Sequence, residues 1–117
     1  MRVEIDVFSG RPNPRWDLSP QEVREFLELF QNLPQSETGG SVKQDLGYRG
    51  LVVTADEKET GGYEKLVISN GIVLASEANK SEQFTDQGRS LERWLLRKAK
   101  GHVPDDLYTS LLSQIEP

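Results

Sequence analysis

Apolar residues occupy alternate positions at the start of the chain. Val3, Ile5 and Val7 are separated by charged residues at positions 2, 4 and 6. Successive side chains of a strand point to opposite faces of a sheet, so this period of two predicts a strand over residues 2–7. One face of that strand is expected in the core and the other in water.

An amphipathic helix is predicted to begin just after Ser19. The Ser19 hydroxyl can cap the first turn, Pro20 suits the first helical position, and Glu22 completes a capping box. Apolar residues then recur at helical spacing and predict a core-facing stripe: Val23, Phe26, Leu27, Phe30 and Leu33. Pro34 marks the end of the helix.

Three further strands are predicted in the middle of the chain. Residues 48–55 are rich in β-branched and aromatic side chains and form the first. Residues 66–75 predict a hairpin, because Asn70-Gly71 suits the two positive-φ positions of a type I′ turn. Both faces of this hairpin are apolar, so it is expected inside the sheet, with both faces covered or with one face meeting a partner.

Two helices are predicted in the last third. One runs from about residue 85 to Lys100 and turns an apolar stripe to the core, with Gly101 ending it. The other opens at Pro104. Residues 35–46, 56–62 and 76–85 are polar and are predicted to be connections.

These elements predict a single α+β domain over residues 1–117. The order is strand, helix, three strands, helix, helix, which favours a mostly antiparallel sheet of about four strands with three helices packed on it. A chain of 117 residues is long enough to bury an independent core. The order leaves open whether the first strand joins the sheet parallel or antiparallel.

Composition narrows the classes of partner and chemistry. A net charge of −5 and a pI near 4.9 argue against nucleic acid and anionic lipid. Six of the fourteen basic residues lie between Lys80 and Lys100, interleaved with Glu82, Asp86 and Glu92, which predicts a helix surface of mixed charge. No cysteine is present, so disulfides and thiolate metal sites are excluded.

The N-terminal sequence and the lengths of the apolar runs bear on cellular location and membrane association. The N-terminal segment alternates charged and apolar residues, unlike a signal peptide, and no apolar run is long enough to span a membrane. A cytoplasmic protein is therefore expected.

The loop of residues 10–16, between the first strand and the first helix, carries the candidate binding residues. Arginine side chains bind carboxylate or phosphate at two points, and the two prolines hold the neighbouring groups in place. The candidates are Ser9, Arg11, Asn13, Arg15 and Trp16. A purely structural interpretation is also open. In it, Gly10 and the prolines make a tight connection between the strand and the helix, and Trp16 anchors the loop in the core.

Other motifs give no catalytic residue, metal site or cofactor. The acidic segment at 56–59 lacks the spacing of a calcium loop, and no phosphate-binding glycine motif occurs. His102, the only histidine, has no serine in a nucleophile-elbow context to activate.

Three functional hypotheses result. The first is a small binding or accessory module that holds a partner protein or a small anionic ligand through the 10–16 loop. The alternative is a small enzyme in which Arg11 and Asn13 stabilise developing negative charge. Self-association through the 66–75 hairpin is compatible with both.

Overall fold

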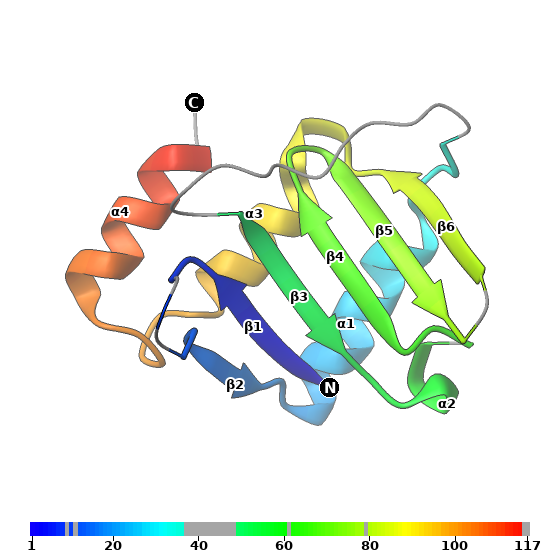
Figure 1. The fold of residues 1–117 in the computed structure, drawn as a ribbon, viewed down its shortest axis with the longest axis horizontal. Helices are drawn as coiled ribbons and strands as arrows, with labels where there is room; N and C mark the ends of the chain where they lie inside the picture. Colours follow the sequence, from blue (N-terminus) through cyan, green and yellow to red (C-terminus); the bar gives the residue numbers. More distant parts are fainter. Residues whose placement is uncertain (9, 11, 37–48, 61, 79, 116–117) are drawn as a thin grey trace.

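A computed structural model describes residues 1–8, 10, 12–36, 49–60, 62–78 and 80–115. Six strands form one sheet in the order β2-β1-β3-β4-β5-β6, and every neighbouring pair is antiparallel (Figure 1). The α+β class is confirmed, and the first strand joins antiparallel. The strands are β1 (Arg2–Asp6), β2 (Arg15–Asp17), β3 (Gly50–Thr54), β4 (Lys65–Ser69), β5 (Ile72–Glu77) and β6 (Lys80–Thr85).

The sheet has six strands rather than the expected four or so. The two additional strands, β2 and β6, are its edges. β2 is three residues long and lies where the loop was expected to continue. β6 occupies part of the segment predicted as a polar connection, and none of its residues is fully buried. An edge strand with few buried side chains carries no strong apolar alternation, which is why the sequence pattern missed both.

Two helices, α1 (Pro20–Gln31) and α3 (Ser90–Arg97), cover one face of the sheet, and α4 (Asp105–Ile115) packs against α3 (Figure 1). A one-turn helix, α2 (Glu57–Thr60), precedes β4. The predicted capping box of α1 is present: the Glu22 N–H donates to Ser19 Oγ at 3.2 Å, and the Ser19 N–H donates to Glu22 Oε1 at 2.9 Å.

The second predicted helix, expected from about residue 85, begins later, at Ser90. β6 continues to Thr85, and a short 3₁₀ turn (Gln87–Arg89) separates it from α3. Gly88 and Arg89 both adopt positive φ, at 67° and 58°, so the chain bends sharply before Ser90.

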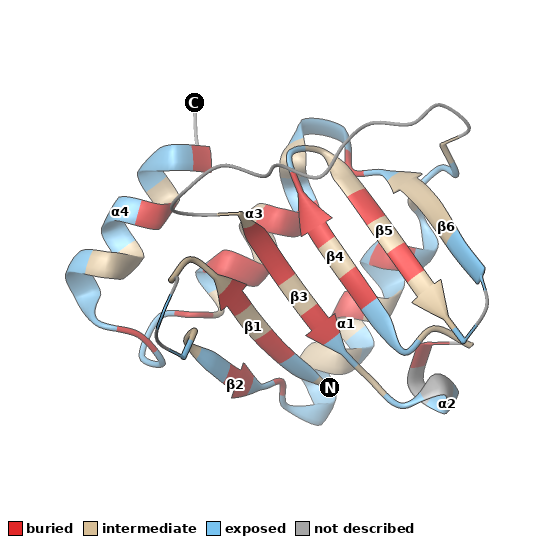
Figure 2. Cartoon of the chain, viewed as in Figure 1, coloured by how far each residue is buried: buried red, intermediate tan, exposed pale blue. Residues whose placement is uncertain are grey.

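The core lies between α1, α3 and the facing side of the sheet, and buried positions alternate along the central strands (Figure 2). The predicted hairpin is confirmed: Asn70 and Gly71 have φ of 54° and 84°, and β4 and β5 lie inside the sheet. Among the described residues, helices cover one of its faces and not the other (Figure 1). On the other face Val67 pairs in register with Leu74, and both are half-buried.

Candidate functional site

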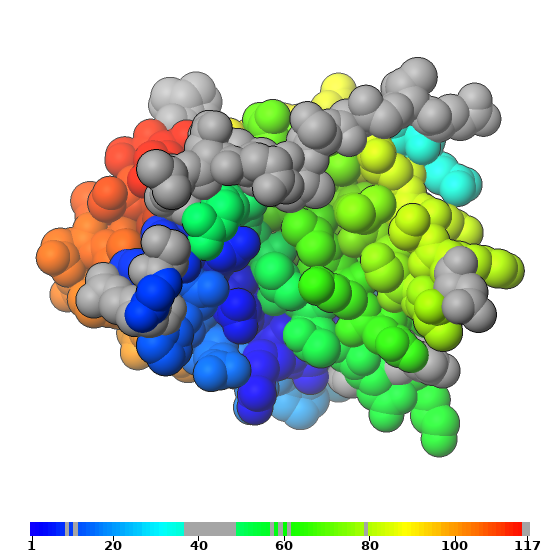
Figure 3. All heavy atoms as spheres, in the orientation of Figure 1, coloured from blue at the N-terminus to red at the C-terminus, as the bar shows by residue number. Residues whose placement is uncertain are grey.

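The sheet face opposite α1 and α3 carries an apolar row formed by Val52, Val67 and Leu74. These residues are cross-strand neighbours on β3, β4 and β5, and each is half-buried. We call this side of the sheet the open face; Figure 3 views the molecule from it. Neighbouring side chains in register lie on the same face of a sheet, so the row continues through Glu4 on β1 to Arg15 on β2.

Charged residues surround a shallow hollow at the β2 end of the open face. The hollow has a volume of about 390 Å³ and mixes both signs of charge. Arg2 Nε lies 3.4 Å from Asp17 Oδ1 in an exposed ion pair. Carboxylates outnumber guanidinium groups in the lining, which consists of Met1, Arg2, Glu4, Arg15, Asp17, Thr54, Ala55 and Asp56.

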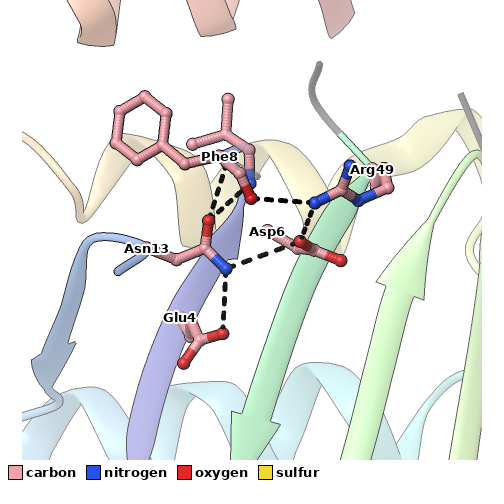
Figure 4. A network of polar contacts seen from close by, with 6 residues as sticks. Glu4, Asp6, Phe8, Asn13 and Arg49 are labelled. Atoms are coloured by element: carbon pink, nitrogen blue, oxygen red, sulfur yellow. Dashed lines mark hydrogen bonds and ion pairs between the residues drawn. The ribbon is translucent and has the colours of Figure 1, made fainter. Parts of the chain in front are cut away.

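Asn13 closes the 10–16 loop onto the end of β1 (Figure 4). Its Oδ1 accepts the backbone N–H groups of Val7 at 3.0 Å and Phe8 at 2.7 Å. Its Nδ2 donates to Glu4 Oε2 at 3.2 Å and to Asp6 Oδ1 at 3.5 Å. All of these bonds lie within the chain, and they account for the position of the loop.

Arg49 extends the same network from the residue before β3 (Figure 4). Its Nη2 donates to Asp6 Oδ1 at 2.7 Å and to the Phe8 carbonyl at 3.0 Å. The hydrogen bond to Asp6 raises the pKa of the Arg49 guanidinium. Sequence reasoning missed Arg49, because only the register of β1 against β3 brings it to Asp6, 43 residues away in the chain.

The structure separates the five candidate residues of the loop. Arg15 is exposed on the open face. Trp16, the next residue of β2, points into the core and is only 7% exposed. Asn13 has the structural contacts described above, and Ser9 and Arg11 lie outside the described residues. A binding role for these residues remains a prediction. Among those described, Arg15 is exposed on the open face, and Asn13 reaches the same face through its hydrogen bonds to Glu4 and Asp6.

Trp16 is the core anchor that the structural interpretation expected. Its ring stacks on His102, with ring centroids 5.5 Å apart and an interplanar angle of 11°. Its Nε1 is buried without a hydrogen-bond partner among the described residues. His102 follows Gly101, whose φ is 88°. α3 ends at Arg97, three residues before the predicted end at Lys100, and a turn at residues 98–99 lies between α3 and Gly101.

Two acidic residues that were expected on a mixed helix surface are buried. Asp86 is 1% exposed, and its Oδ1 and Oδ2 accept the backbone N–H groups of Leu91 at 2.8 Å and Glu92 at 3.0 Å. Glu92 is fully buried; its Oε1 accepts from Arg89 Nε at 2.9 Å. Orphan N–H groups at a helix start need acceptors, and this requirement explains the burial of Asp86.

Tyr63, which precedes β4, makes a polar contact on the side of the sheet that α1 covers. Its hydroxyl donates to Glu82 Oε2, and its ring packs edge-on against Phe30 and Phe84. Burial, with the Glu82 hydrogen bond second, raises the pKa of Tyr63 to about 12.

The described part of the chain contains no cluster of three metal-ligating side chains and no helix long and apolar enough to cross a membrane. Comparison with protein-family models, with curated proteins and with solved structures finds no significant match.

Proposed function

We propose that the protein is a small binding module that holds a partner protein on the open face of its sheet, next to the 10–16 loop. The observation that carries this proposal is the half-buried apolar row of Val52, Val67 and Leu74, which no described helix covers. Contiguous apolar side chains bordered by charged ones are typical of protein contact surfaces. Arg15 links this row to the loop, because it belongs to both.

The charges favour a protein over a small anionic ligand. Three carboxylates line the hollow beside the row and alternate with two guanidinium groups, so the hollow offers an anion no purely positive pocket. A protein surface can match an alternating pattern of both signs while it covers the apolar row. Arginine is also enriched in protein contacts.

Site-specific photocrosslinking in the source cells tests this proposal. A benzophenone amino acid replaces Val67, at the centre of the row, and in a control it replaces the exposed Gln114 on α4. We expect one predominant adduct with another protein from position 67 and none from position 114. The Arg15→Glu substitution is expected to reduce that adduct several-fold.

Two results would contradict the proposal. Equal labelling from both positions, or none from either, would show that the open face has no preferred partner. An adduct with the mass of two copies of this chain would instead assign the open face to self-association through the 66–75 hairpin.

A further inference from the structure

A second contact surface lies on the helical side of the molecule, in the groove between α1 and α3. Leu29 on α1 is 40% exposed, the one large apolar residue with so much exposure among the described residues. Trp94 on α3 is half-buried, and the centroid of its ring lies 6.4 Å from the ring centroid of Phe26 on α1. Leu29 and Trp94 line one hollow of about 440 Å³ together with Ser90, Arg93 and Arg97.

The charged groups of this hollow are all positive. Arg93 and Arg97 are four residues apart on α3 and therefore lie on the same side of the helix. The Lys98 ammonium lies 5.1 Å from the centre of the Trp94 ring. No carboxylate lines the hollow; Glu25 and Glu28 of α1 line a separate one.

Arg93 has its guanidinium group available for a partner. It makes no hydrogen bond or ion pair with the described part of the chain, and its Nη2 lies beside Gly88, 3.7 Å from the position that a Cβ would take there. Arg93 therefore lies at the hollow, next to the 3₁₀ turn that precedes α3. A positive hollow around two apolar side chains is unexpected in a chain of net charge −5.

We propose that the α1–α3 groove docks a short acidic peptide segment of a partner protein. An apolar side chain of that segment contacts Leu29 and Trp94, and its carboxylates pair with Arg93 and Arg97. Guanidinium groups bind carboxylates at two points, and an aromatic ring supplies a large apolar contact. The groove lies across the sheet from the open face, so this inference does not depend on the function proposed above.

A nucleic acid fits the groove less well. Nucleic-acid affinity grows with the number of phosphates that are neutralised along the strand, and here the cations gather around a single aromatic residue. The remaining surface of an acidic protein repels the rest of a long polyanion. A segment with only a few carboxylates avoids that repulsion.

Fluorescence anisotropy with defined probes tests the proposal on the full chain. The main probe is a labelled peptide of about ten residues, aspartate and glutamate flanking a central Leu-Phe pair. Matched peptides carry lysine in place of the acidic residues or alanine in place of Leu-Phe. Oligouridylate and phosphatidylserine vesicles represent nucleic acid and membrane. We expect binding of the main probe, weaker binding of the alanine peptide and none of the lysine peptide.

Substitutions then locate the contact. Arg93→Glu combined with Arg97→Glu is expected to weaken binding of the main probe about tenfold or more, because two charge-assisted contacts become repulsive. Arg2→Glu combined with Arg15→Glu makes the same change of charge on the open face and is the matched control, expected to leave binding unchanged. Leu29→Ala removes exposed surface without a charge change, so it tests the apolar contact independently of helix stability.

Each contrary result overturns the proposal. Absence of binding to the main probe, or binding that survives both the double substitution and Leu29→Ala, would show that the groove is not the site. Tighter binding of oligouridylate or of the vesicles, lost on the double substitution, would assign the groove to a different class of partner.

Discussion

Glu92 Oε1 accepts the backbone N–H of Asn70 at 3.1 Å, so a buried carboxylate of α3 holds the turn between β4 and β5. Asn70 lies in the turn, beyond the last paired residues Ser69 and Ile72, so no cross-strand pairing supplies an acceptor for its N–H. Arg89 supplies the compensating charge, with Nη2 at 2.9 Å from Glu92 Oε2. The start of α3 and the central hairpin are therefore fixed by one side chain.

Replacing Glu92 by glutamine is expected to lower the free energy of unfolding by about 2 kcal/mol, because Arg89 loses its charged partner in a buried setting. Urea unfolding measures the change. Glu28→Gln on the exposed side of α1 is the control, expected within about 0.5 kcal/mol of the parent chain. Equal effects of the two substitutions would contradict a special role for Glu92.

Asn13→Ala is expected to destabilise the chain by about 1–3 kcal/mol, since it leaves the N–H groups of Val7 and Phe8 without their acceptor. Arg15→Ala, two residues later and exposed, is expected to change stability by less than about 0.5 kcal/mol. Urea unfolding of both variants checks this. A larger loss for Arg15→Ala than for Asn13→Ala would reverse our assignment of roles within the loop.

Gly50→Ala is expected to cost about 2–4 kcal/mol. Gly50 has a φ of 122°, and an added Cβ would lie 2.6 Å from the Ile68 carbonyl oxygen, so strain and a backbone clash add together. Gly10→Ala is the matched comparison: its φ is 82°, with no atom of the described chain within 4 Å of the added Cβ. Only the conformational cost, about 1 kcal/mol, is expected there.

Stability is expected to fall as the pH rises from 10 to 12. The pKa of Tyr63 is raised in the folded chain, from 10.0 to about 12, so the unfolded chain loses this proton first and is favoured progressively across that interval. The contribution is fully present below pH 10. Urea midpoints across this range measure the change.

Tyr63→Phe is expected to remove that part of the pH dependence, whereas Tyr108→Phe on α4 is expected to leave it in place. Tyrosinate absorbance followed in parallel should show one tyrosine fewer titrating near pH 12 in Tyr63→Phe. An unchanged pH profile in Tyr63→Phe would show that folding does not raise the pKa of this hydroxyl.

Local signals in the sequence determined the elements that bury a continuous apolar stripe or contain a marked turn. The capping box at Ser19 and Glu22, the Asn70-Gly71 turn and Gly101 after α3 each depend on neighbours within a few residues. A capping box, a tight turn or a glycine after a helix has the same local geometry in any fold, because it depends only on residues nearby in the sequence. The α+β class with an antiparallel sheet followed from them.

Tertiary structure alone decided the features that depend on distant partners. β2 and β6 are strands because β1 and β5 supply hydrogen bonds, while their own side chains stay largely exposed. Asp86 and Glu92 look like surface residues in the sequence, yet backbone N–H groups at the start of α3 and at the β4–β5 turn require acceptors in the interior.

The same distinction applies to the candidate site. The sequence placed Asn13, Arg15 and Trp16 together in one loop, but β pairing sends Arg15 to the open face and Trp16 to the core, because adjacent residues of a strand point in opposite directions. The hydrogen bonds of Asn13 to the end of β1 depend on the path of the loop back over that strand. Composition specified which groups are present, and the register of the strands decided which of them meet.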